Sequence, residues 1–226
     1  MNFDGFVLAA STADLDEEPD ARDHADIIEF RMDQASDPLA ALDDYDGDLP
    51  ILATNRVEWE GGDAPDDEDR LVALAAATEH PAVEAIDVEL AAIVGARNDD
   101  ALWTIAHARE RDASVVVSIH DFEETPAREE CGRLLDQALE FGDVAKLAVM
   151  AESRADVLHL LGVTHAKTEA GERVATMAMG ETGRHSRAVA PLYGSRIGYA
   201  PVDPERATAP GQYDLATLRE LVDALR

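Results

Sequence analysis

Lysine is almost missing from this chain: it accounts for only two of the 19 basic residues, and arginine supplies the rest. One of the two, Lys146, lies inside the apolar run 144–150, which has the composition of a buried β-strand. Burying an ammonium group is costly unless the group is paired or neutral. Lys146 is therefore interpreted either as a desolvated amine that attacks a carbonyl carbon to form an imine, or as a lysine that extends from a strand end to water. On this residue alone, the second interpretation describes the commoner situation.

Cysteine and long apolar segments are also scarce. Cys131 is the only cysteine, so no disulfide can form within the chain, and this fits a reducing compartment. The sequence has no signal-peptide core and no run of 18 apolar residues that would span a membrane. We therefore expect a soluble, cytoplasmic protein that does not associate with membranes.

Positive charge is scarce as a whole, since 48 acidic residues face 19 basic ones and the formal net charge is −29. The acids gather in runs at 14–26, 43–48 and 63–69, which we interpret as solvated loops rather than as metal ligands. The negative charge disfavours nucleic acid and anionic membranes as partners. Together with the scarcity of lysine, it is typical of proteins from salt-rich cytoplasms, where self-repulsion is screened.

The hydrophobic pattern alternates between apolar runs of strand length and amphipathic segments. Strands are predicted at Gly5–Ala10, Ile27–Met32, Leu49–Thr54, Glu84–Glu89, Ser114–His120, Asp143–Met150, Val174–Met179 and Ile197–Pro201. Helices are predicted at Leu39–Leu42, Asp66–Glu79, Ala101–Arg111, Arg128–Phe141, Arg154–Leu161, Ser186–Tyr193 and Leu215–Leu225. Eight strands alternating with helices, and no long linker, predict a single (β/α)8 barrel over 1–226, with its active site at the carboxyl ends of the strands. An open doubly wound sheet is the alternative.

His120 ends the buried run 114–120, one strand and one helix before Lys146. In a parallel sheet these two strands are neighbours, so both side chains can face one cavity. A proton-transfer group beside an imine-forming amine is a specific chemical arrangement. A histidine with its hydrogen bonds satisfied in the core remains the alternative.

Further charged residues follow other predicted strands. Glu29 and Arg31 stand two positions apart, so they point to one face and either line the pocket or form a structural ion pair. Arg56 and Glu60 come after the next strand, where the Glu60 carboxylate is placed to orient His120. Asp87, with Glu89 two residues on, repeats the pattern, and we interpret this pair as structural contacts within the barrel.

The last part of the chain carries candidates for binding an acid. Arg187, at the start of a predicted helix, can hold a substrate carboxylate. Met177 and Met179 share one strand face and serve as core or as a pocket wall. The loop after the last strand carries hydroxyl and amide groups at Thr208 and Gln212, which suits a lid over the site.

Taken together, these residues resemble type I 3-dehydroquinate dehydratase over nearly the whole chain. The matching segments are Glu29–Asp33, Thr54–Arg56, Glu60–Gly62, Ser118–Phe122, Thr125–Pro126, Lys146, Met177–Gly180, Ser186–Arg187, Gly194–Ser195 and Ala209–Gln212. The family often has a serine where this chain has Thr208. The resemblance implies a (β/α)8 barrel, commonly a homodimer, that converts 3-dehydroquinate to 3-dehydroshikimate and water with no metal or organic cofactor.

The resemblance also implies a role for each residue. Lys146 would form the imine, His120 would be the general acid and base, and Glu60 would position the histidine. Arg187 would bind the substrate carboxylate. The residues implied to hold the rest of the substrate, chiefly its hydroxyls, are Glu29, Arg31, Arg56, Thr208 and Gln212.

Two alternatives use part of the same pattern. A class I aldolase or transaldolase-like barrel also forms a lysine imine but cleaves a carbon–carbon bond, and His120 distinguishes the two. A barrel that only binds a polyhydroxy carboxylate would have no use for the amine of Lys146.

The acidic composition predicts that folding depends on salt. A formal charge of −29 on one domain repels strongly at low ionic strength, and the Debye length shrinks to about 3 Å at 1 M salt. The thermal midpoint should therefore be markedly higher in about 2–3 M KCl than in about 0.1 M KCl. A midpoint that stayed flat or fell as KCl rose would mean that the acids are balanced by pairing with arginine.

Overall fold

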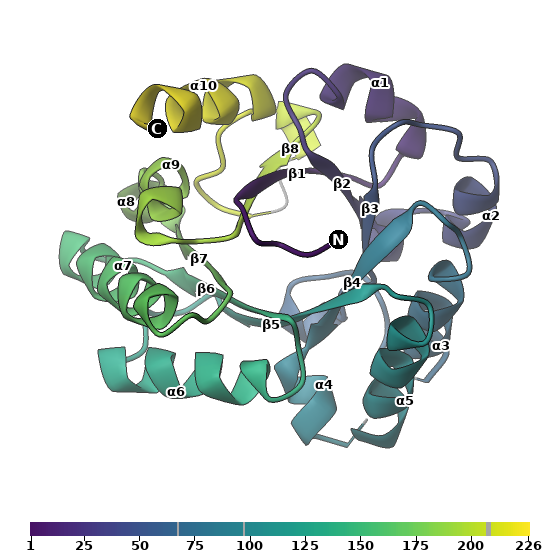
Figure 1. The fold of residues 1–226 in the computed structure, drawn as a ribbon, viewed down its shortest axis with the longest axis horizontal. Helices are drawn as coiled ribbons and strands as arrows, with labels where there is room; N and C mark the ends of the chain where they lie inside the picture. The colour runs from purple at the N-terminus through teal and green to yellow at the C-terminus, as the bar shows by residue number, and fades with distance from the viewer. Residues whose placement is uncertain (67, 97, 207–208) are drawn as a thin grey trace.

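Eight parallel strands form the centre of the molecule in the computed structural model, which describes residues 1–66, 68–96, 98–206 and 209–226. The strands are β1 (Val7–Thr12), β2 (Ile27–Arg31), β3 (Ile51–Thr54), β4 (Val83–Glu89), β5 (Ser114–Asp121), β6 (Val144–Met150), β7 (Val174–Met179) and β8 (Ile197–Pro201). Their spatial order follows the chain, with β8 returning to pair with β1. This arrangement confirms the (β/α)8 barrel and excludes the doubly wound sheet (Figure 1).

The ring closes between β7 and β8 through single contacts just before β8 begins. The amide of Arg196 donates to the carbonyl of Val174 at 2.8 Å. The hydroxyl of Ser195 accepts the amide of Thr176 at 3.0 Å, so a side chain takes the place of a strand carbonyl. The barrel is nearly closed, and its inward side chains share one interior.

Helices surround this barrel on its outside (Figure 1). They are α1 (Glu18–Ala21), α2 (Pro38–Asp43), α3 (Glu68–Ala77), α4 (Leu90–Val94), α5 (Asn98–Arg109), α6 (Arg128–Leu139), α7 (Arg154–Glu169), α8 (Gly180–Gly183), α9 (Ser186–Val189) and α10 (Leu215–Leu225). The sequence did not predict α1, α4 or α8, and it ended α7 at Leu161, eight residues too early. Within the described residues, no helix has the length and apolarity needed to cross a membrane.

The acidic run 14–26 is not a plain solvated loop, because a 3-10 turn (Leu15–Glu17) and α1 occupy part of it. Leu15 and Ala21 are buried there, and Glu18 is 1% exposed beside Arg22. The run is therefore anchored by two apolar contacts and an ion pair. Among the described residues, no group of three or more histidine, cysteine, aspartate or glutamate side chains is arranged to hold a metal ion.

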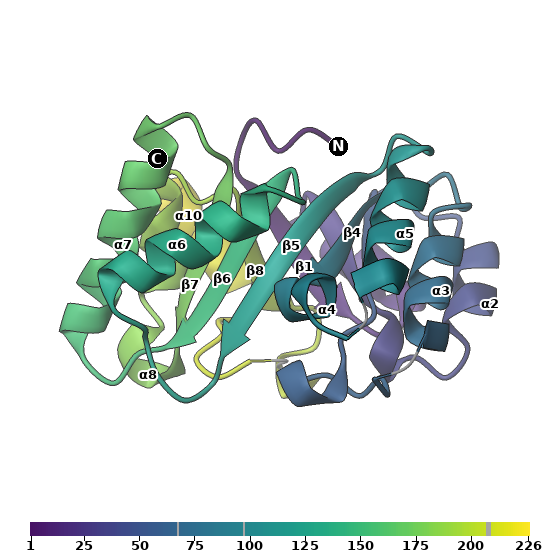
Figure 2. The ribbon, with the colours of Figure 1, turned by 90° about the horizontal axis from the view of Figure 1, so that it is seen from below.

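The barrel interior is organised by the two-residue period of its strands. An apolar set of inward side chains fills its amino-terminal part: Ala9, Ile27, Leu52, Ala85, Val116, Val144, Ala175 and Ile197. Phe3, 1% exposed, packs into the same cluster from the segment before β1. That segment lies at the opposite end of the barrel from the loop after β8, so one end is plugged and the other is left for a site (Figure 2).

Two residues farther along each strand, the next inward positions change character. We call this set the polar row, and its members are Ser11, Glu29, Thr54, Asp87, Ser118, Lys146, Met177 and Tyr199. All but Met177 carry a hydroxyl, a carboxylate or an amine. All eight are at most 6% exposed. The polar row marks the depth at which the packed core ends and the chemistry begins.

Candidate active site

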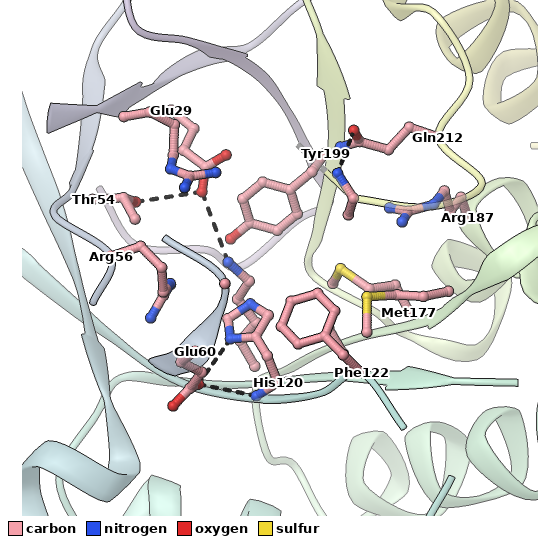
Figure 3. Close-up of a pocket in the computed structure, with 16 residues that line it drawn as sticks. Glu29, Thr54, Arg56, Glu60, His120, Phe122, Met177, Arg187, Tyr199 and Gln212 are labelled. Atoms are coloured by element: carbon pink, nitrogen blue, oxygen red, sulfur yellow. Dashed lines mark hydrogen bonds and ion pairs between the residues drawn. The ribbon is translucent and has the colours of Figure 1, made fainter. Parts of the chain in front are cut away.

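A cavity lies at the carboxyl ends of the strands, above the polar row (Figure 3). Eight of the nine residues predicted from sequence line it: Glu29, Arg31, Arg56, Glu60, His120, Lys146, Arg187 and Gln212. The ninth, Thr208, lies outside the described residues. Met177 and Met179 also line the cavity, so these methionines wall the pocket as well as packing on the core.

Lys146 does not extend to water. Its residue is 4% exposed, and its Nζ donates to Oδ2 of Asp87 at 3.0 Å and lies 3.8 Å from Oε1 of Glu29. The same nitrogen stands 4.2 Å from the centroid of the Tyr199 ring. The interpretation of Lys146 as a lysine that extends from a strand end is therefore wrong, and the amine faces the cavity between two carboxylates and an aromatic face.

Asp87 is the acceptor that this arrangement shares. Besides Lys146, its carboxylate accepts from Nη2 of Arg56 at 2.6 Å and from the hydroxyl of Ser118 at 2.5 Å. Burial alone raises the pKa of Asp87, but Arg56 and Lys146 outweigh it and hold that pKa well below its usual range. Asp87 therefore stays ionised under Lys146, and its contacts are polar contacts within the barrel, as the sequence indicated.

Glu89 completes the buried charges on the side of β4. It accepts from Arg56 at 2.8 Å and from Arg70 at 2.9 Å. Burial alone would lower the pKa of Arg56, but the carboxylates of Asp87 and Glu89 outweigh burial and raise that pKa above its usual value. The guanidinium therefore stays charged. Arg56 thus lines the cavity with a guanidinium that is already paired, and the contacts of Glu89 are structural, as the sequence indicated.

His120 and Glu60 come together from distant parts of the chain, although 60 residues separate them. Oε1 of Glu60 accepts the backbone amide of His120 at 3.0 Å and lies 2.9 Å from its Nδ1 (Figure 3). Because that oxygen already accepts one N–H, we assign the His120 ring proton to Nδ1, which leaves Nε2 free to accept a proton. The Phe122 ring stacks on the imidazole, with centroids 6.1 Å apart and an angle of 14° between the planes.

The charge states of this pair follow from burial and from nearby cations. Burial raises the pKa of Glu60 to about 8, against the opposing effect of Arg56. Burial, Arg56 and Lys146 together lower the pKa of His120 well below its usual value. Near neutral pH the imidazole is therefore a neutral base.

Glu29 and Arg31 both line the cavity but do not pair with each other. The Glu29 carboxylate accepts from the hydroxyls of Ser11 at 2.5 Å and Thr54 at 3.3 Å. Arg31 makes a bidentate pair with Asp33, with distances of 3.0 and 2.7 Å. Arg31 does form a structural ion pair, but with Asp33 rather than with Glu29.

Arg187 places a buried guanidinium at the cavity mouth. It is 4% exposed, and its Nη2 donates to the carbonyl of Pro210 at 3.3 Å. Within the part of the chain that the structure describes, no carboxylate pairs with this guanidinium, and burial lowers its pKa to about 10. Gln212 lies on the same loop as Pro210, and its Oε1 accepts a hydrogen bond from the amide of Ala209 at 3.1 Å. This side of the cavity is suited to an anionic group.

The second lysine has a different environment. Lys167, on α7, has a side chain that is 14% exposed and ion-paired with Asp136 and Glu172. Burial lowers the pKa of Lys167, but its hydrogen bonds to these two carboxylates outweigh burial and raise it. The prediction of an exposed lysine is wrong here, yet Lys167 lies outside the cavity and is held as a cation.

Comparison with known proteins identifies close relatives of this chain. A family model described as type I 3-dehydroquinase matches residues 7–226. The 3-dehydroquinate dehydratase of Haloarcula marismortui is 61% identical over 226 residues, covering all of this chain and 99% of the relative. The protein of the same name from Halobacterium salinarum is 53% identical, with full coverage of both.

Solved structures give the same result. The 3-dehydroquinate dehydratase of Geobacillus kaustophilus has a TM-score of 0.82 at 30% identity, covering 98% of this chain and 91% of its own. A type I 3-dehydroquinate dehydratase of Clostridium difficile, solved with covalently modified comenic acid, has a TM-score of 0.86 at 26% identity, covering 98% and 93%.

The raised pKa of Glu60 predicts a specific dependence of stability on pH. Because the folded-state pKa of about 8 lies above the ordinary 4.5, the protonated carboxyl favours folding. Its contribution is fully present below about pH 4.5 and is lost as pH rises through about 8. Glu60→Gln, which keeps a neutral side chain, should therefore gain a few kcal/mol relative to the wild type between pH 5 and pH 8.5.

Urea unfolding across this range, in concentrated KCl, measures the effect. Glu58→Gln is the matched control, because it makes the same substitution at an exposed residue of the 3-10 turn that also holds Glu60 (Glu58–Glu60). Parallel stability curves for wild type and Glu60→Gln would contradict the prediction.

Proposed function

Because this chain belongs to the type I 3-dehydroquinase family, we propose that it removes water from 3-dehydroquinate through an imine formed at Lys146. Family membership makes the protein an enzyme, a hydro-lyase. Its relatives from Haloarcula and Halobacterium also agree with the acidic, lysine-poor composition. The imine and the residue roles below are our proposal.

The observation that carries the proposal is the position of Lys146. It is a primary amine, 4% exposed, that faces the cavity beside His120 on the neighbouring strand. Attack on the substrate carbonyl needs the neutral amine, and Asp87 at 3.0 Å is an ionised acceptor that can hold the nitrogen in place. Arginine, which supplies nearly all other positive charge, cannot form an imine.

His120 is suited to move protons for this chemistry. An iminium at the carbonyl carbon acidifies the adjacent C–H, and the unprotonated Nε2 of His120 removes that proton. The resulting enamine expels the β-hydroxyl, which leaves as water after His120 returns the proton. Hydrolysis of the product imine then frees Lys146. Glu60 fixes the imidazole through its two contacts at 2.9 and 3.0 Å.

The rest of the cavity is suited to a polyhydroxy carboxylate. Arg187, the buried cation without a carboxylate partner among the described residues, would bind the carboxylate. Glu29 and Gln212 present oxygen and nitrogen atoms that would bind hydroxyls. Arg31 and Arg56 already have carboxylate partners, so we propose that they act mainly through their charge and their spare N–H donors.

The alternative functions and the remaining predictions from the sequence stand as follows. An aldolase or a barrel that only binds a carboxylate has no support from the relatives, which are named as dehydratases. Catalysis without metal or organic cofactor, a homodimer, a single domain over 1–226 and a cytoplasmic location stay predictions.

Borohydride reduction in the presence of 3-dehydroquinate tests the imine. Reduction should attach the substrate carbon skeleton to Lys146, and peptide mass mapping should find the label there. Lys167 is the internal control, because it is ion-paired outside the cavity. Lys146→Ala should lose the label and nearly all dehydratase activity while keeping the wild-type circular dichroism spectrum. Label at Lys167 alone, or wild-type activity in Lys146→Ala, would show that the imine assignment is wrong.

His120→Ala should separate proton transfer from imine formation. A positioned proton-transfer group contributes about 10²–10⁴-fold, so kcat should fall by that factor while Lys146 is still labelled under borohydride. His159→Ala, on an exposed position of α7, is the control and should behave as wild type. An unchanged kcat in His120→Ala would identify His120 as a core histidine without a catalytic role.

A further inference from the structure

Tyr199 on β8 has a hydroxyl that nothing among the described residues explains. The residue is 4% exposed, and its Oη, although shielded from solvent, has no hydrogen-bond partner within residues 1–66, 68–96, 98–206 and 209–226. A buried hydroxyl without a partner costs free energy, whereas phenylalanine would fill the same space at no such cost. The hydroxyl therefore needs a reason beyond its contacts with the described residues.

The location of the hydroxyl points to the cavity. Tyr199 belongs to the polar row and lines the cavity, and its phenol oxygen points toward the side that carries Glu29, Thr54 and Arg56 (Figure 3). Burial, together with the charges of Glu29 and Asp87, raises the pKa of Tyr199 well above its usual value. The hydroxyl thus keeps its proton and can donate a hydrogen bond.

The carboxylates nearby already have donors of their own. Glu29 accepts from Ser11 and Thr54 and lies near Lys146, and Asp87 accepts from Arg56, Ser118 and Lys146. None of these contacts involves the phenol. Within the described residues the phenol thus has no acceptor, and a ligand in the cavity can supply one.

The aromatic ring has a separate task. Nζ of Lys146 lies 4.2 Å from the ring centroid, close enough for a cation–π contact. Phenylalanine would provide that contact equally well, so the ring does not account for the hydroxyl. Since Nζ lies against this ring, a carbon bonded to Nζ comes next to the ring, and the oxygen on that carbon can come within reach of the phenol hydroxyl.

We infer that Tyr199 is a further catalytic residue, whose hydroxyl donates a hydrogen bond to the oxygen on the carbon that Lys146 attacks. The inference rests on the proposed function. When the nitrogen lone pair forms the C–N bond, the π electrons of the carbonyl move to that oxygen, and the hydrogen bond stabilises its negative charge. Two protons from the amine nitrogen then leave with the oxygen as water, the imine nitrogen takes up one proton from solvent to become the iminium, and Tyr199 ends neutral, as it began.

Tyr199→Phe tests the role, since it removes the hydroxyl and keeps the ring. Hydrogen bonds to a developing charge suggest that the rate of imine formation, followed by borohydride quench and mass spectrometry, should fall about ten- to hundredfold. The thermal midpoint should stay equal to or above that of the wild type, because an unpaired buried hydroxyl is lost. Tyr193→Phe removes the same atom from a residue that is 42% exposed and lies outside the cavity, and it should change neither quantity.

The outcomes separate this inference from the proposed function. If wild type is labelled at Lys146 and Tyr199→Phe forms the imine at the same rate, the inference is wrong and the proposed function stands. A lower thermal midpoint with unchanged imine formation would also overturn it, because the hydroxyl would then have a structural partner. If wild type is not labelled at all, both fail.

Discussion

The site depends on one buried carboxylate, Asp87, and on the need to pair every charge around it. Three donors from three different strands or their ends converge on it: the amine of Lys146, the guanidinium of Arg56 and the hydroxyl of Ser118. Removing one partner of a buried pair is strongly destabilising, because the other charge is left uncompensated. The geometry of Lys146 is therefore coupled to the packing of the barrel, because its amine shares the Asp87 carboxylate with Arg56 and Ser118.

The need to pair buried charges divides the barrel interior into three levels. The apolar set that includes Val116 and Phe3 fills the amino-terminal part of the barrel with side chains that cannot hydrogen-bond to water. Above it, the polar row holds charges that satisfy one another. Higher still, at the mouth, Arg187 has no carboxylate partner among the described residues and His120 keeps one ring nitrogen free to accept. Groups that are paired fix the geometry, and groups that are not paired remain for the substrate.

The sequence predicted the eight strands well, because each is a short apolar run whose pattern is local. It missed α1, α4 and α8, which are short. In addition, α1 lies in an acidic run whose two buried apolar residues give little signal. The chemistry of Asp87 could not be predicted from its own strand, because its partner Lys146 lies 59 residues away. Tyr199 was also missed, since an aromatic residue in a strand is most often core. The available signal was its place two residues beyond a buried apolar position, in register with the other members of the polar row.

The scarcity of lysine can be related to what lysine and arginine side chains can each do in the cavity. Arginine can replace lysine in an ion pair, and it fills that role beside Asp87, Glu89 and Asp33. It cannot replace lysine where a primary amine must lose its proton and bond to carbon. Under the proposed imine mechanism, a chain that builds almost all its positive charge from arginine thus retains lysine at the cavity position where a guanidinium could not react. The same argument gives Lys167 no special chemical role, because an arginine could also form its ion pairs with Asp136 and Glu172.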